Sequence, residues 1–280
     1  MKILITGGNN GYIGRNLYKL FSSENKHQVY CPSKNILNLL DKTKVEWVLK
    51  SFNPDIIIHT AIQGGNRLEK DSVNIIKNNV EMYENLMKFV SKYTTVIIFG
   101  SGAEFDKRKN IDHIDENEIY NRFPVDPYGI SKNIITRQAI QDVRKVYVLR
   151  LFGCFNYDEE YTRFIKNCII NIKNNNTIQI NKNIYMDFFY LDDVFTVINH
   201  IINNKNITER HINLVYNDKY TLKTIANKIK VMMKREDLSI VCHNYKSIHT
   251  YTGSGLKLKE MNLNLIGLDE GIARTIQQLS

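Results

Sequence analysis

The chain has 280 residues, of which 43% are hydrophobic, which fits one large domain or two coupled ones with an ample core. Its formal net charge is +9 at pH 7, but the lysines are scattered and form no aromatic-interleaved basic block, so we expect no nucleic-acid partner. The N-terminus leads directly into a strand and no apolar stretch is long enough to span a bilayer, which predicts a cytoplasmic protein without a membrane partner. The four cysteines lie far apart without metal or redox spacing, so we expect reduced thiols and no metal site.

The first predicted element is a short buried strand, Ile3–Ile5, which leads into a glycine-rich turn. The glycines stand at three-residue spacing, at Gly8, Gly11 and Gly14, and a helical pattern of apolar residues follows. Strand, glycine turn and helix in this order suit a dinucleotide, because the backbone can approach a pyrophosphate and free N–H groups at the helix N-terminus face it. The stretch therefore predicts a dinucleotide site at the start of the chain.

Buried strands and helices alternate along the next part of the chain. The expected strands are His27–Cys31, Ile56–His59, Thr95–Phe99 and Lys145–Leu151. The expected helices between them are Lys44–Phe52, Val73–Ser91 and Tyr128–Arg144. This rhythm predicts an α/β fold with a doubly wound parallel sheet.

The alternation loosens beyond Asn156, where helices dominate. They are expected at Arg163–Lys173, Val194–Asn204, Leu222–Lys234 and Leu268–Gln278. We therefore expect a dinucleotide-binding domain over residues 1–155. A smaller substrate-binding domain is expected over residues 156–280, with some segments returning to the first sheet.

Tyr128 and Lys132 are four residues apart at the start of a predicted helix, so one turn places both on the same face. Asp126 and Pro127 precede them as a capping side chain and a proline at the first helical position. A lysine ammonium near the phenol lowers a tyrosine pKa from its usual ~10 and prepares it to exchange a proton with a carbonyl or hydroxyl. Ser101 follows a predicted strand, at the edge where such sheets bind ligands, and its hydroxyl can hydrogen-bond the same oxygen.

The residues after the second strand indicate which phosphate state the cofactor has. An acidic residue there would bind the ribose 2′-hydroxyl and repel a 2′-phosphate. The chain instead has a hydroxyl and a cation, Ser33 and Lys34, with no carboxylate. This favours NADP(H) bound by these two residues, with NAD(H) as the alternative.

Four motifs carry a resemblance to a known family, and they are Thr6–Gly14, Phe99–Ala103, Asp126–Lys132 and Asp187–Val194. Together they resemble the extended short-chain dehydrogenase/reductase family, in its epimerase/dehydratase group that acts on nucleotide-activated sugars. The resemblance covers nearly the whole chain, and Leu37–Asp41 and Gly64-Gly65 look most like the GDP-fucose synthase branch. It implies a Rossmann fold with a smaller C-terminal substrate domain, a nucleotide-diphosphate sugar as substrate, and a homodimer.

The resemblance also implies roles for individual residues. Ser101, Tyr128 and Lys132 would form the catalytic triad. The cofactor would contact Gly8, Gly11, Tyr12, Ile13, Gly14, Leu40, Asp41, Ala61, Ile62, Asn79, Tyr128, Lys132 and Phe152, besides Ser33 and Lys34.

Two departures from the family pattern concern the chemistry. Family dehydratases have Asp-Glu directly after the catalytic serine or threonine, and here these positions are Gly102 and Ala103, so we expect no dehydration. Fucose-synthase-type epimerisation uses a cysteine at the position of Ala103 and a histidine further on. No histidine occurs between His113 and His200, so double epimerisation by that route is not expected.

Two further departures concern the sugar nucleotide. The arginine that the family has directly before its Asp-Phe pair is Met186, and the asparagine after Arg-Leu-Phe is Gly153. Arg163, Lys166 and Asn167 are candidate replacements, or they form a solvated helix face. Beside the catalytic serine, Gly102 is a further candidate for substrate contact.

These observations predict NADPH-dependent reduction of the C4 keto group of a nucleotide-linked 4-keto-6-deoxy sugar, in the biosynthesis of activated deoxysugars. A 4-epimerase is the first alternative, because it uses the same triad and retains its NAD through both hydride steps. A non-catalytic dinucleotide sensor is the second alternative, although such proteins usually lose the tyrosine or the lysine.

Overall fold

The computed structural model describes residues 1–65, 71–204, 207–244 and 249–280. It divides into two compact units, and each is assembled from segments that are separated in the sequence. Unit 1 comprises Met1–Asp106, Glu116–Arg150 and Ile198–Ile212. Unit 2 comprises Lys107–Asp115, Leu151–Val197 and Asn213–Ser280.

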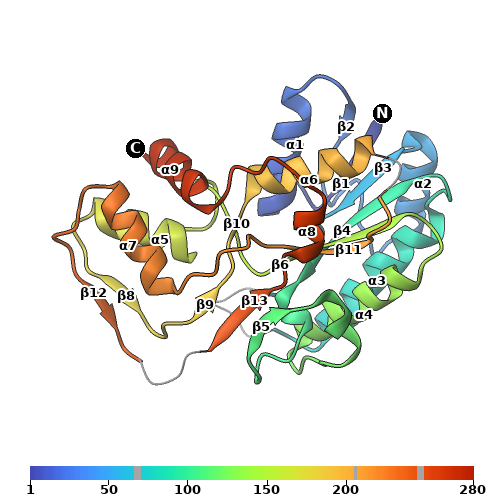
Figure 1. The fold of residues 1–280 in the computed structure, drawn as a ribbon. Helices are drawn as coiled ribbons and strands as arrows, with labels where there is room; N and C mark the ends of the chain where they lie inside the picture. Colours follow the sequence, from blue (N-terminus) through green and yellow to red (C-terminus); the bar gives the residue numbers. More distant parts are fainter. Residues whose placement is uncertain (66–70, 205–206, 245–248) are drawn as a thin grey trace. The chain divides into compact units, whose positions relative to one another are not determined.

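Unit 1 is built around a six-stranded sheet with the strand order β11-β6-β4-β3-β1-β2 (Figure 1). Its strands are β1 (Lys2–Thr6), β2 (Gln28–Tyr30), β3 (Ile56–His59), β4 (Thr95–Ser101), β6 (Val146–Leu151) and β11 (His211–Leu214). β1 pairs in parallel with β2 on one side and with β3 on the other, and β3 pairs in parallel with β4. Successive strands are thus added first on one side of β1 and then on the other, and the carboxyl end of β1 lies at the switch point where doubly wound sheets bind ligands.

Helices cover both faces of this sheet. They are α1 (Tyr12–Ser23), α2 (Lys42–Phe52), α3 (Asn74–Phe89), α4 (Pro127–Gln141) and, shared between the units, α6 (Leu191–Asn203). One face is closed by a core cluster that joins Leu4 and Ile57 to buried residues of α2, α3 and α4. Figure 1 shows α1 on the other side of the strands, where it buries Leu17 and Phe21.

The helix boundaries follow from local capping. Asp41 accepts the N–H groups at the start of α2, and Asn53, in the left-handed conformation, ends that helix. At α4 the Asp126 side chain accepts the N–H of the helix's third residue, and proline occupies the first position. The helix expected to reach Arg144 ends at Gln141, because the carboxylate of Asp142 binds the backbone and guanidinium of Arg144 instead.

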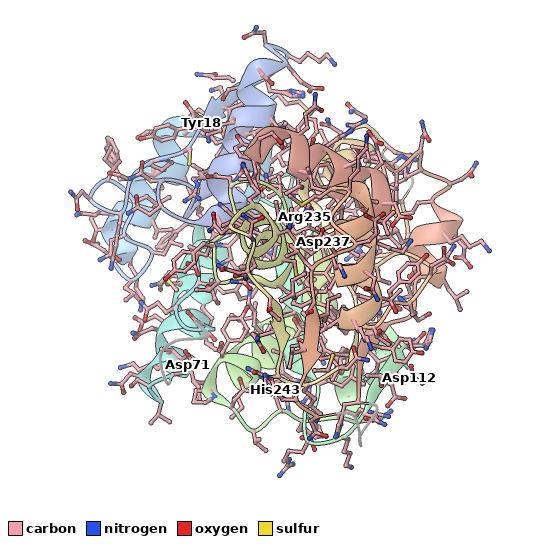
Figure 2. The ribbon with its side chains drawn as sticks, turned by 90° about the vertical axis from the view of Figure 1, so that its left-hand side faces the viewer. Tyr18, Asp71, Asp112, Arg235, Asp237 and His243 are labelled. Atoms are coloured by element: carbon pink, nitrogen blue, oxygen red, sulfur yellow. The ribbon has the colours of Figure 1, made fainter. Side chains whose placement is uncertain are left out.

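Unit 2 has short strands and a helical core. Its strands are β5 (Ile111–Ile114), β7 (Cys154–Phe155), β8 (Ile178–Ile180), β9 (Tyr185–Met186), β10 (Phe189–Tyr190), β12 (Ile240–Cys242) and β13 (Thr250–Gly253). Its helices are α5 (Phe164–Lys173), α7 (Leu222–Met232), α8 (Leu256–Glu260) and α9 (Leu268–Leu279). α5, α7 and α9 share one apolar cluster. After α7, the half-buried Arg235 and the exposed Asp237 form an ion pair; both are labelled in Figure 2.

Two short 3-10 helices, η1 (Gly102–Glu104) and η2 (Glu116–Tyr120), complete the described elements. η1 follows β4 directly, so it sits at the carboxyl edge of the sheet. Across the described ranges, every helix is too short or too polar to cross a membrane.

Candidate active site

The turn between β1 and α1 is built on glycines that approach other backbone closely. Gly7 has φ +74°, and a Cβ on it would lie 2.5 Å from the Cα of Ala61. A Cβ on Gly14 would lie 2.6 Å from the Cα of Gly8. Gly11 is the N-cap of α1 and makes no side-chain cap hydrogen bond, and the N-terminus of a helix suits an anion. The turn therefore has the geometry of a phosphate cradle.

A cavity of about 400 Å³ lies beside this turn, at the carboxyl ends of β1, β2 and β3. The cavity lies at the switch point of the sheet, where doubly wound folds bind their ligands. Its lining residues all belong to unit 1 and are Gly7, Asn9, Asn10, Gly11, Pro32, Lys34, Leu37, Asn38, Leu39, Thr60, Ala61, Ile62, Gln63 and Met82.

Except for Phe152, the residues expected to contact a cofactor lie in unit 1, and they fall into two groups. Gly11, Lys34, Ala61 and Ile62 line the cavity. The others lie outside its lining and are Gly8, Tyr12, Ile13, Gly14, Ser33, Leu40, Asp41, Asn79, Tyr128 and Lys132. Sequence reasoning missed Gln63 and the Asn9–Asn10 pair, and only their place in the loops that follow β3 and β1 would have indicated them.

Asn79 and Asp41 bind backbone near the cavity. The amide of Asn79 donates to the carbonyl of Gln63 at 2.9 Å and accepts its N–H at 2.8 Å, which fixes a residue of the cavity wall. Asp41 accepts the N–H groups of Thr43 and Lys44 and thereby caps α2. Asn79 thus holds part of the cavity wall, whereas Asp41 holds the start of α2.

The charge around the cavity has one sign. Among the described residues that line it, Lys34 is the one with a charged side chain, and it is exposed to solvent. No carboxylate is among the described residues of this lining. The cavity is therefore electrostatically suited to an anionic group near the end of β2.

Ser101 ends β4 and begins η1. Its Oγ accepts the N–H of Ala103 at 3.1 Å, which leaves the hydroxyl proton to donate elsewhere. Its own N–H donates to Glu104 Oε1 at 2.7 Å. Tyr128 and Lys132 come from the first turns of α4, which lies in the same unit and contacts η1.

Lys132 is a buried lysine. Its Nζ donates to the carbonyl oxygen of Phe99 at 2.6 Å and lies 6.0 Å from the ring centroid of Tyr128. Burial lowers the pKa of Lys132 to about 8, while the charge of Glu104 acts in the opposite direction. Burial and the nearby Lys132 lower the pKa of His59 to about 3, so this histidine is neutral, with Nδ1 2.7 Å from a threonine hydroxyl.

The ring of Tyr128 packs against the loop after β3. A Cβ on Gly65, which has φ +74°, would lie 2.9 Å from Cε2 of that ring. The N–H of Gly65 donates to the carboxylate of Asp71, which lies just before α3 (Figure 2). The Gly64-Gly65 pair is therefore placed so that its backbone borders the phenol.

The remaining predicted site residues are distributed between the units. Gly102 lies buried in η1 of unit 1. In unit 2, the Phe152 ring packs 5.2 Å from that of Tyr251, and Arg163 and Asn167 occupy the N-cap and first turn of α5. Lys166 is engaged with two backbone carbonyls of the preceding loop.

The four cysteines are free thiols. Burial raises the pKa of Cys31, which adjoins the glycine turn. Within the described residues, no three His, Cys, Asp or Glu side chains are grouped so that they could bind a metal ion.

The sequence of the chain matches a known protein family over most of its length. Residues 3–215 match the NAD dependent epimerase/dehydratase family. The chain belongs to this family. The match includes the glycine turn, the cavity lining and the three residues expected to be catalytic, and it extends through β11.

Two kinds of curated protein are similar to the chain in sequence. The GDP-6-deoxy-D-talose 4-dehydrogenase of Aggregatibacter actinomycetemcomitans is 24% identical over 224 residues, which is 74% of this chain and 73% of that protein. The methionine adenosyltransferase 2 subunit beta of Bos taurus is 27% identical over 157 residues, or 54% of this chain. The chain spans under half of that subunit, 46% of its length.

Solved structures of nucleotide-sugar enzymes share the fold over the whole chain. The UDP-glucose 4-epimerase of Thermotoga maritima, solved with UDP-glucose, has a TM-score of 0.82 at 19% identity, covering 100% of this chain and 98% of its own. The GDP-mannoheptose C4 reductase of Campylobacter jejuni, solved with NADP, has a TM-score of 0.81 at 16% identity. The match covers 99% of this chain and 98% of the reductase. The fold is thus the Rossmann fold of the epimerase/dehydratase enzymes, with a parallel central sheet.

Proposed function

We propose that this epimerase/dehydratase family member is an NADPH-dependent reductase of the C4 keto group of a nucleotide-linked 4-keto-6-deoxy sugar. One observation carries the proposal. Ser101, Tyr128 and Lys132 are all present in the unit that holds the glycine turn, and the positions after Ser101 are the apolar Gly102 and Ala103. The site thus has the groups for proton transfer to a carbonyl and lacks the carboxylate pair of a dehydratase.

The residues present fit a nicotinamide dinucleotide. The glycine turn would admit a pyrophosphate, and the uncapped start of α1 would bind its charge. Lys34, in a lining without carboxylates, would bind a 2′-phosphate, which favours NADPH over NADH. The bound nicotinamide supplies the hydride for C4.

The chain's own residues supply the proton and orient the carbonyl. Tyr128 donates its phenolic proton to the C4 oxygen, since that oxygen becomes basic as the carbonyl is reduced. Ser101 donates a hydrogen bond to the same oxygen and keeps its proton, because its Oγ already accepts the N–H of Ala103 and its O–H is therefore directed elsewhere. The ammonium of Lys132, buried near the Tyr128 ring, favours the phenolate that remains.

The relatives' chemistry supports the choice of substrate class. Their names describe C4 oxidation or reduction of GDP-linked sugars and C4 epimerisation of UDP-glucose. All three reactions exchange a hydride at C4, which is the step that the triad here serves. Epimerisation remains the runner-up, because it needs the same three side chains.

The test is incubation of the protein with a panel of nucleotide 4-keto sugars and NADPH in deuterated water, with products identified by NMR. We expect one equivalent of NADPH oxidised per sugar reduced at C4, and no deuterium at C3 or C5. Interconversion of two C4 epimers without net NADPH consumption would show an epimerase. Tight NADPH binding with no turnover of any panel member would show a sensor.

A further inference from the structure

The carboxylate of Glu104 joins the two elements that carry the candidate catalytic residues. Glu104 lies in η1, three residues after Ser101, and is fully buried. Its Oε1 accepts the backbone N–H of Ser101 at 2.7 Å and the hydroxyl of Thr136 at 3.0 Å. Thr136 follows Lys132 by four residues on α4. The Oε1 atom of Glu104 is therefore bound both by Ser101 at the end of β4 and by the helix that carries Tyr128 and Lys132.

The second carboxylate oxygen is neutralised by Arg150. Nε and Nη2 of Arg150 each lie 2.9 Å from Glu104 Oε2, and both side chains are fully buried. The guanidinium lies 5.0 Å from the ring centroid of Phe105. An apolar pair of similar volume stabilises a core at least as well as a buried ion pair, so stability alone does not explain these residues.

Two further contacts hold η1 against α4. The side-chain amide of Asn133 donates to the carbonyl oxygen of Glu104 at 3.0 Å. A Cβ on Gly129 would lie 2.3 Å from the carbonyl oxygen of Ala103, so only glycine permits this approach. The turn that bears Ser101 is thus fixed to the helix at several points, with Glu104 at the centre.

We propose that Glu104 is a positioning residue for the reduction, with Arg150 as its counter-ion. Its carboxylate fixes Ser101 relative to Tyr128 and Lys132, and its negative charge keeps Lys132 an ammonium. This assignment rests on the proposed function, since it gives Ser101 and Lys132 their roles in that reaction.

The electrostatic part follows from the groups that face Lys132. They are Glu104 from η1, His59 from β3 and Tyr128 from α4 itself. His59 is neutral because burial lowers its pKa to about 3, so Glu104 is the anion of this set. Removal of its charge will therefore lower the pKa of Lys132 further below its ordinary value.

Three variants separate the two roles. Glu104→Gln combined with Arg150→Met removes both buried charges, while the Gln carbonyl still accepts from Ser101. Thr136→Val keeps the charges and removes only the hydrogen bond from α4 to the Glu104 carboxylate. Asp142→Asn is the control, because it removes a carboxylate that is paired with an arginine at the far end of the same helix.

Two readouts apply to each variant. The first is the titration of the Lys132 side chain by NMR in ¹³C-lysine-labelled protein without ligands, with the signal assigned by its loss in Lys132→Met. The second is the pH profile of kcat/KM for the keto sugar. In the double variant we expect both the Lys132 titration and the alkaline limb of the pH profile to move to lower pH, because the charge of Glu104 is what raises the Lys132 pKa. In Thr136→Val we expect kcat to fall about tenfold while the alkaline limb of the pH profile stays in place. In Asp142→Asn we expect neither kcat nor the alkaline limb to change.

An unmoved Lys132 titration in the folded double variant overturns the electrostatic role, and full kcat in Thr136→Val overturns the positional one. If the double variant does not fold, Thr136→Val still decides the positional role. If the titration moves but the unmutated protein reduces no keto sugar, the proposed reaction is wrong while the coupling of Glu104 to Lys132 stands.

Discussion

At the scale of single residues, the ammonium of Lys132 gives the reaction its pH dependence. Its pKa is lowered to about 8, from an ordinary value of 10.5, so the charged form dominates only below about pH 8. We expect kcat/KM to fall as the pH rises through about 8, because an uncharged amine no longer favours the phenolate of Tyr128. A pH profile that stays flat to pH 10 would contradict this role.

Tyr128→Phe separates proton donation from binding. The change keeps the ring packed against Gly65 but removes the phenol. Turnover should fall about 10²–10⁴-fold, whereas NADPH affinity should change less than about tenfold, the equivalent of one hydrogen bond. Lys132→Met should damage both quantities. Steady-state kinetics and calorimetric titration with NADPH measure them, and near-full turnover in Tyr128→Phe would mean that another group donates the proton.

Lys34 should determine the choice between NADPH and NADH. Lys34→Ala removes the charged side chain of the cavity lining, so NADPH should bind more weakly by about 1 kcal/mol, or about fivefold, while NADH binding stays the same. Lys26→Ala, at an exposed lysine paired with Glu24, is the matched control and should change neither affinity. Equal affinities for NADPH and NADH in the unmutated protein would rule out the preference.

At the scale of elements, the glycine turn depends on the absence of side chains. In Gly14→Ala the new methyl would lie 2.4 Å from Oγ1 of Thr60 and 2.6 Å from Cα of Gly8, so α1 must move away from the turn. We expect NADPH affinity to fall more than about tenfold, and Tm to drop by several degrees, as for overpacked sites. Gly255→Ala is the control, because its new methyl meets no atom closer than 3.3 Å. Unchanged NADPH affinity in Gly14→Ala would contradict the cradle.

Elements with strong local signals were predictable from the sequence. Apolar runs such as Ile56–His59 form strands because burial on both faces demands continuous apolar side chains, and the start of α4 follows from its capping residue and proline. The two-residue strands of unit 2, such as β9 and β10, were missed, because distant partners rather than local sequence define them. The end of α4 was misplaced because Asp142 competes for the backbone through a side-chain contact that periodicity does not reveal.

The candidate site was predictable to the extent that motifs name residues. Ser101, Tyr128 and Lys132 stand out by position along the chain, and they remain predictions for the experiments above. Gln63 and Glu104 carry no such signal. Gln63 matters through its hydrogen bond to Asn79, which is distant in the sequence, and Glu104 through its hydrogen bond to Ser101 within a turn. Such contacts appear only once strands and helices are packed.

At the scale of the whole molecule, acid stability should depend on His59. Its pKa of about 3 lies below the ordinary 6.5, so between these values the unfolded chain binds a proton that the folded protein does not. The free energy of unfolding should therefore fall as the pH drops from 6.5 toward 3, by up to about 1.4 kcal/mol per pH unit. Denaturant titrations across this range measure the slope.

His59→Gln should flatten that slope, because glutamine has no proton to gain. His243→Gln is the control, since His243 lies exposed at the surface, beside Gln179 (Figure 2). An unchanged slope in His59→Gln would show that other groups govern the acid transition.

The interleaving of the two units also has a consequence for synthesis on the ribosome. When residues up to Leu151 have emerged, β6 is complete but its neighbour β11, at His211–Leu214, is not yet translated. During that interval β6 is the edge strand of the sheet, and the side chains that are buried in the folded protein are exposed there. Such an edge binds chaperones or aggregates. The nascent chain is thus most vulnerable between these two points, and a ribosome stalled there would display an open sheet.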